Sequence, residues 1–177
     1  MPNNILITSY PNVGKTTLIN KIMKQLNCEV GGFITFEKLR KGKRCGFYIE
    51  DFDGNKMTMA DVNIKSNYQV SKYKVDLEAF EKIGLPALLK AKKKADIIIV
   101  DEIGTMETFS KKFCRVLVDI FNCKKPLLAT IKKKNYPFTT KLKKREDVTL
   151  FNLTYKNRNK LLNPILEKIN RVLKESL

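Results

Sequence analysis

The sequence predicts an α/β fold in which a mostly parallel β-sheet carries helices on both faces. Apolar runs of strand length alternate with segments whose apolar residues recur at helical spacing, which is typical of a parallel sheet covered by helices. The run IIIV at residues 97–100 is apolar on both faces, as a central parallel strand is. With 177 residues and 43% hydrophobic content, the chain can bury roughly 70% of its unfolded surface. We therefore expect a single domain over residues 1–177.

In the first half of the chain, residues 4–8 form a short apolar strand, and residues 15–26 fit a helix with Leu18, Ile22 and Leu26 on one face. Two strand-like pieces, residues 33–37 and 45–51, flank a basic turn, and a turn at Asp53-Gly54 leads into residues 56–59. These pieces predict a small antiparallel β-hairpin insertion at about residues 31–60.

In the second half, Asp76 is a candidate N-cap for a helix that runs to residue 94 and that Gly84 and Pro86 can kink. The strand at residues 97–100 follows, then a helix at 109–121 and strands at 126–131 and 148–153. A last amphipathic helix begins or kinks at Asn163-Pro164.

Cysteine and histidine usage excludes several kinds of chemistry. The four cysteines are scattered without a CxxC pair, and the chain has no histidine, which argues against a zinc site, a disulfide framework and histidine-dependent catalysis. The N-terminal MPNN lacks the basic region of a leader, and no window approaches the roughly 20 apolar residues of a membrane span. We expect a monomeric cytoplasmic protein that does not bind membranes.

The chain is strongly basic, with 35 Lys and Arg against 18 Asp and Glu and a formal net charge of +17. Such a charge attracts polyanions, so weak non-specific binding of nucleic acid is one expectation. The lysines also lie in several separate clusters, as on an ordinary solvated surface, and no dedicated nucleic-acid module accompanies them.

The stretch SYPNVGKTTL predicts a phosphate-binding loop between the first strand and the first helix. The pattern GxxxxGK[ST] aligns on Ser9, Gly14, Lys15 and Thr16. In such a loop the backbone N–H groups surround the phosphates, the lysine bridges the β- and γ-phosphate oxygens, and the threonine hydroxyl binds Mg²⁺. The expected nucleotide contacts are Ser9, Tyr10, Pro11, Asn12, Val13, Gly14, Lys15, Thr16 and Thr17.

Two positions of this loop depart from the usual glycines. Serine stands at residue 9, and asparagine stands at residue 12. Asparagine is among the few non-glycine residues that adopt a positive φ at modest cost. We therefore expect a working site for ATP or GTP, with a small cost at Asn12.

The acidic pair Asp101-Glu102 follows the apolar strand and indicates the rest of a phosphoryl-transfer site. An aspartate in this place holds the magnesium shell, and an adjacent glutamate can orient and deprotonate the attacking water. Because the chain has no histidine, a carboxylate is the natural base, with Glu102 as the first candidate and Glu107 in reserve. Thr130, at the end of another strand, is a candidate for positioning the water, although threonine also suits strand ends by propensity alone.

The segment LTYKNRN after the last strand lies where nucleotide-binding sheets usually meet the base. Thr154, Asn157 and Arg158 are therefore candidate base contacts, with Arg158 able to stack on the base or pair with phosphate. Helix capping by Thr154 or Asn157 is the alternative interpretation.

The segments YPNVGKTTL, GGFITFEKLRKGKRCGF, VDEIGTMETFSKKF, LLATI and TYKNRNKLL together resemble the cancer-related, or THEP-type, nucleoside-triphosphatase family over nearly the whole chain. The resemblance implies a three-layer, RecA-like P-loop NTPase fold. It also implies Mg²⁺-dependent hydrolysis of ATP, GTP and other nucleoside triphosphates, with slow turnover and broad base tolerance. It places the phosphate loop on residues 9–17, the magnesium aspartate on Asp101, the water-activating glutamate on Glu102, and a basic hairpin with Arg40 and Arg44 near the nucleotide.

The chain departs from that family at several positions. The family usually has glycine where Asn12 stands and commonly where Ser9 stands, lysine where Thr105 stands, and often histidine where Lys132 stands. Two other functions stay open. One is a nucleotide or small-molecule kinase, with residues 138–145 as the candidate lid, and the other is a nucleotide-regulated nucleic-acid-binding protein.

Overall fold

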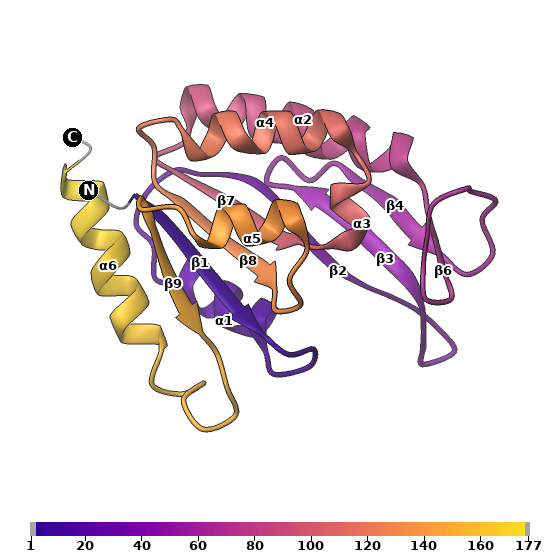
Figure 1. Ribbon diagram of the computed structural model, residues 1–177, viewed down its shortest axis with the longest axis horizontal. Coiled ribbons are helices and arrows are strands. Elements are labelled where there is room, and N and C mark those ends of the chain that lie inside the picture. Colours follow the sequence, from indigo (N-terminus) through magenta and orange to yellow (C-terminus); the bar gives the residue numbers. More distant parts are fainter. Residues whose placement is uncertain (1–2, 176–177) are drawn as a thin grey trace.

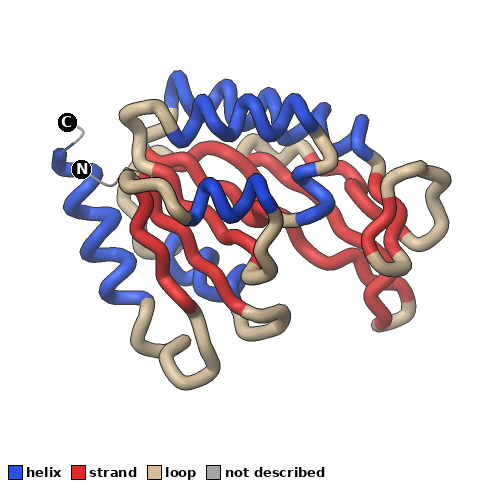
Figure 2. Tube along the Cα trace, viewed as in Figure 1, coloured by secondary structure: helices blue, strands red, loops and turns tan. Residues whose placement is uncertain are grey.

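The computed structural model describes residues 3–175, in which one nine-stranded sheet lies between two layers of helices (Figures 1 and 2). Met1 and Pro2, the first two residues of the MPNN segment considered above as a leader, lie outside the described residues. The strands are β1 (Asn4–Ser9), β2 (Val30–Arg40), β3 (Lys43–Asp51), β4 (Lys56–Asp61), β5 (Gln69–Val70), β6 (Tyr73–Val75), β7 (Ile97–Ile103), β8 (Leu127–Lys132) and β9 (Val148–Asn152). The helices are α1 (Lys15–Met23), α2 (Leu77–Lys94), α3 (Thr105–Thr108), α4 (Lys111–Phe121), α5 (Pro137–Lys143) and α6 (Leu162–Glu175).

The sheet has a parallel half and an antiparallel half, in the order β5-β6-β4-β3-β2-β7-β8-β1-β9. Strands β2, β7, β8, β1 and β9 are parallel to their neighbours in this run, so their carboxyl ends meet along one edge. Strand β8 separates β1, which leads into the phosphate loop, from β7, which carries Asp101 and Glu102. This edge therefore brings the predicted site residues together.

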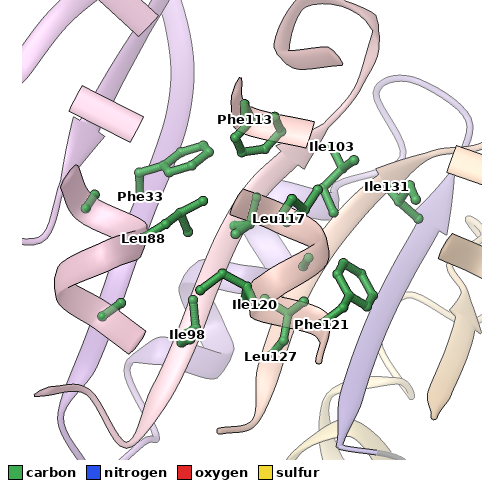
Figure 3. Packing of buried hydrophobic residues seen from close by; sticks show 14 of the residues in the cluster. Phe33, Leu88, Ile98, Ile103, Phe113, Leu117, Ile120, Phe121, Leu127 and Ile131 are labelled. Carbon is green, nitrogen blue, oxygen red and sulfur yellow. The ribbon is translucent and has the colours of Figure 1, made fainter. Parts of the chain in front are cut away.

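Two hydrophobic clusters hold the layers to the sheet. Helices α2, α4 and α5 pack on one face, where Phe33, Phe113 and Leu117 are fully buried (Figure 3). Helices α1 and α6 pack on the other face through residues such as Ile19 and Ile169. Along β7, successive residues of the run 97–100 alternate between the two clusters, which confirms the prediction of a strand buried on both faces. The α/β, three-layer fold class is confirmed.

The antiparallel part is larger than the hairpin predicted at about residues 31–60 and is continuous with the main sheet. The first residues of β2 pair with β7 in parallel, and its later residues pair with β3 in antiparallel fashion. Strands β5 and β6 then extend this part to Val75. These strands have two and three residues, too few for a period-two pattern to be visible in the sequence. The assignment of residues 1–177 to a single domain stays a prediction, and the continuous sheet supports it.

The helix boundaries follow local capping. Asp76 caps α2 as predicted, because its side chain accepts a hydrogen bond from Ala79 N at 2.9 Å. The helix predicted at residues 109–121 is α4, which begins two residues later than predicted because Ser110 accepts from Phe113 N at 2.9 Å and caps it. The short helix α3 before it was not predicted. Helix α5 was not predicted as a helix. Among residues 3–175, no helix is long and apolar enough to cross a membrane.

Candidate active site

The loop between β1 and α1 has the backbone shape that a phosphate loop needs. Asn12 has φ 63° and Gly14 has φ 111°, so both occupy the left-handed region. The expectation that Asn12 adopts the glycine-like conformation is confirmed. Helix α1 begins at Lys15, and no side chain caps its first turn. The free N–H groups and the positive end of the helix dipole therefore offer a site for an anion.

Replacing Asn12 with glycine is expected to tighten nucleotide binding by up to about fivefold, because the strain of an L-residue in this conformation costs about 1 kcal/mol. Isothermal titration with a non-hydrolysable triphosphate measures the change. Asn12→Ala is the matched comparison, and it should bind more weakly than the parent, because alanine adopts a positive φ less readily than asparagine. Unchanged or weaker nucleotide binding by the glycine variant would show that asparagine at residue 12 does not lower the affinity.

The hydroxyl group of Ser9, which stands where the family commonly has glycine, makes two hydrogen bonds within the loop. Ser9 is almost fully buried, its hydroxyl donates to the Tyr10 carbonyl oxygen at 2.7 Å, and it accepts a hydrogen bond from Lys15 Nζ at 3.2 Å. The ammonium group of Lys15 is thus held back over its own loop, where a phosphate would sit. Tyr10 is 66% exposed, and Lys133 Nζ lies 4.4 Å from the centre of its ring.

The side chains of Thr16, Asp101 and Thr130 meet at the carboxyl edge. Asp101 accepts from Thr16 Oγ1 at 3.1 Å on one carboxylate oxygen and from Thr130 Oγ1 at 2.5 Å on the other. Burial raises the pKa of Asp101 to about 6, against the opposing effect of the Thr130 hydroxyl. Thr130 is fully buried, so in this structure its hydroxyl orients Asp101 rather than reaching toward a water.

Glu102 and Glu107 lie on either side of Gly104. A Cβ atom added to Gly104 would meet Glu107 Oε2 at 2.9 Å and Glu102 Oε1 at 3.4 Å, so the two carboxyl groups approach the same point. Glu102 is half-buried, whereas Glu107 is 6% exposed and accepts from Gly104 N at 2.9 Å. Burial, with a further contribution from Glu102, raises the pKa of Glu107 to about 8. A carboxyl group that stays protonated near neutral pH is a poor reserve base.

The loop after β9 lies beside the phosphate loop, because the Tyr155 hydroxyl donates to the Asn12 carbonyl oxygen at 3.4 Å. The side chain of Asn157 is engaged within this loop: its amide oxygen accepts from Thr154 N at 2.7 Å and its amide nitrogen donates to the Asn152 carbonyl at 2.9 Å. With the bond from Asn157 N to Thr154 Oγ1 at 3.3 Å, these bonds close a turn before α6 begins at Leu162. Thr154 and Asn157 thus cap this turn rather than α6, and their role as base contacts stays a prediction.

The role of Arg158 as a base contact stays a prediction. Arg158 is exposed, and its guanidinium lies 5.7 Å from the ring centre of Tyr155, which is itself 64% exposed. Sequence reasoning missed Tyr155, although a tyrosine between two candidate base contacts was a visible signal.

Two other predicted groups are engaged away from the phosphate loop. In the hairpin, Arg44 pairs with Glu37 at 2.6 Å, and Arg40 lies 3.8 Å from Asp61. Arg145, in the candidate lid, pairs with Asp147, which also binds Asn4 at the start of β1. Arg145 is therefore at the amino edge of the sheet, opposite the phosphate loop, and the interpretation of residues 138–145 as an arginine lid is wrong.

A parallel sheet whose first strand leads through left-handed Asn12 and Gly14 into an uncapped helix, with a buried aspartate touching Thr16, defines a P-loop nucleotide-binding protein. The comparisons with known proteins agree. The model of the NTPase family matches residues 4–166, and the chain belongs to this family.

Relatives cover the chain almost completely. It is 49% identical over 170 residues to the nucleoside-triphosphatase THEP1 of Thermotoga maritima, covering 94% of this chain and 97% of that protein. It is 34% identical over 182 residues to the human cancer-related nucleoside-triphosphatase, covering 94% and 96%. The crystal structure of THEP1 from Aquifex aeolicus superposes with a TM-score of 0.85 at 34% identity, covering 95% of this chain and 99% of that one. This likeness supports the P-loop NTPase fold.

Proposed function

We propose that this protein is an Mg²⁺-dependent nucleoside triphosphatase that hydrolyses ATP, GTP and other nucleoside triphosphates to diphosphate and phosphate, slowly and with broad base specificity. The contact between Thr16 and Asp101, at the mouth of the phosphate loop, carries the proposal. The names of the relatives, which are nucleoside-triphosphatases, support the reaction. The four free thiols fit a cytoplasmic protein, which we propose to act as a monomer.

The residues present fit a magnesium ion. Asp101 is a buried carboxylate whose hydrogen-bond partners are two neutral hydroxyl groups, so its negative charge calls for a cation. Among the described residues, no cluster of three or more His, Cys, Asp or Glu could hold a metal. Mg²⁺ suits such a site, because it commonly takes one or two protein oxygens and completes its shell with water and substrate phosphates. Thr16 and Asp101 would hold it, and it would neutralise charge on the β- and γ-phosphates.

In the proposed reaction, the loop N–H groups and Lys15 hold the phosphates while Glu102 orients a water molecule toward the γ-phosphorus. The water oxygen forms a bond to phosphorus, and the bond from phosphorus to the β–γ bridging oxygen breaks, with its electron pair leaving on the diphosphate. Glu102 accepts the proton of the water and later releases it to solvent. The half-buried position of Glu102, one residue after Asp101, supports this role.

The exposed side chains beside the phosphate loop support the proposed breadth of base specificity. Tyr155 and Arg158 are both exposed, and an aromatic ring or a guanidinium plane stacks on any base. The polar groups of Asn157, which could read a base edge, are engaged within their own turn.

A nucleotide panel tests the function. With Mg²⁺, ATP, GTP, CTP and UTP are each expected to release phosphate at rates within about tenfold of one another, because stacking discriminates weakly between bases. Adding nucleoside monophosphates should not change the product, and adding RNA should not raise the rate. A second nucleotide product would indicate a kinase, stimulation by RNA would indicate a nucleic-acid-regulated protein, and no release with any nucleotide would refute the proposal.

A further inference from the structure

Lys132 occupies a special place at the carboxyl edge of the sheet. It is the last residue of β8, the strand between β1 and β7, and its register partner on β1 is Ser9, the first residue of the phosphate loop. Ser9 is also the residue whose hydroxyl holds the ammonium of Lys15. Two lysines therefore flank Ser9, one from the loop and one from the neighbouring strand.

The alternation along β8 gives the direction of the Lys132 side chain. Leu128 packs in the cluster that contains α1, and Thr130, two residues on, donates to Asp101. Side chains two residues apart lie on the same face of a sheet, so Lys132 lies on the face that carries α1. Two residues of strand span about 7 Å, so Lys132 lies about that much nearer the carboxyl edge of the sheet than Thr130, the residue that contacts Asp101.

In the described part of the chain, the ammonium of Lys132 has a hydroxyl partner, lies 6.0 Å from the centre of the Tyr136 ring, and pairs with no carboxylate. Its Nζ donates to Thr105 Oγ1 at 3.3 Å, and Thr105 comes three residues after Glu102 at the end of β7. Within residues 3–175, the ion pairs involve other lysines and arginines, and none involves Lys132. The side chain is half-buried, which makes a charge without a counter-ion costly and open to an incoming anion.

The adjacent lysines differ from Lys132. Lys133 lies over the Tyr10 ring and donates to Asn152 at 3.3 Å. Lys134 is exposed and lies 5.7 Å from the centre of the Tyr136 ring, which Lys132 also approaches, at 6.0 Å. Of the three consecutive lysines, Lys132 combines the position beside Ser9 with a hydrogen bond to the end of β7.

We propose that Lys132 is a further catalytic residue, a second cation that contacts the terminal phosphate of the substrate from the β8 side while Lys15 contacts it from the loop. The inference rests on the proposed function. In a loose phosphoryl-transfer transition state, negative charge is spread over the equatorial oxygens of the γ-phosphoryl group, and an ammonium that reaches one of them stabilises it. Thr105 holds the ammonium in place before the substrate arrives.

Lys132→Met tests the proposal, with Lys134→Met as the control for net charge. The Lys132 variant is expected to lower kcat by about 10²-fold. It should also weaken binding of a non-hydrolysable triphosphate by about tenfold or more, while leaving diphosphate affinity unchanged. Lys134→Met should change none of these, and Lys132→Arg, which keeps the charge, should retain most of the turnover.

Three outcomes would overturn the proposal: full turnover in Lys132→Met, equal losses in the Lys132 and Lys134 variants, or equal losses of triphosphate and diphosphate affinity. Thr105→Val is the second variant, to be used if Lys132→Met does not fold. It should lower kcat and triphosphate affinity by less than Lys132→Met does, and an unchanged kcat would count against the proposal. If the parent protein hydrolyses triphosphates and Lys132→Met does so equally well, the inference fails while the proposed function stands.

Discussion

Replacing Lys15 with alanine is expected to lower triphosphate hydrolysis by about 10³-fold while leaving the fold intact. The lysine follows Gly14 at the start of α1, and its ammonium is tethered to Ser9 Oγ above the loop. Removing a preorganised donor aimed at the developing charge costs 10² to 10³ in rate, and this donor also contributes to binding the ground-state phosphates. Phosphate release from ATP and GTP at saturating Mg²⁺ measures the effect.

Lys21→Ala is the matched control for this variant. Lys21 lies in the last turn of the same helix and is exposed, so its loss removes one positive charge without touching the loop. It is expected to hydrolyse triphosphates at the parental rate. Phosphate release by Lys15→Ala at the rate of the control would mean that the loop is not the reaction site.

The phosphate loop and the acidic pair could be predicted because each combines a sequence pattern with a required place in the fold. The loop needs a strand before it and a helix after it, and the run IIIV before Asp101 needs to be buried on both faces. Both requirements are local, and the structure meets both. The left-handed backbone of Asn12 was likewise predictable from the residue type alone.

The other features of the site depend on contacts between residues far apart in the chain. The bond from Thr130 to Asp101 exists because β8 separates β1 from β7, and the sequence does not state this strand order. The same order places Lys132 beside Ser9. Arg145 was misplaced for a related reason: α5 carries the chain from the carboxyl end of β8 back to the amino end of β9.

The continuation of β2 beyond the parallel sheet also depends on a tertiary contact. At Gly32, where φ is 113°, a Cβ atom would lie 2.0 Å from the Ile99 carbonyl oxygen. The pair Gly31-Gly32 reads in the sequence as a break before a strand, but it lies inside β2 and permits a close approach to β7.

Replacing Glu102 with glutamine is expected to lower kcat by about 10²- to 10⁴-fold without weakening nucleotide binding, because the variant loses proton transfer but keeps the shape of the side chain. Single-turnover phosphate release measures the chemical step, and titration with a non-hydrolysable triphosphate measures binding. Equal affinity with lost turnover is the signature of a group that acts only in the transition state.

Glu107→Gln separates the two candidate bases. Burial keeps the Glu107 carboxyl group mostly protonated at neutral pH, and its Oε2 accepts from Gly104 N, a bond that the oxygen of a glutamine amide can also accept. A neutral amide therefore replaces a neutral carboxyl group with little change in charge, and kcat should fall by less than about tenfold, well short of the loss of a general base. A large loss in Glu107→Gln with normal turnover in Glu102→Gln would reverse the assignment, making the buried carboxyl group the base despite its raised pKa.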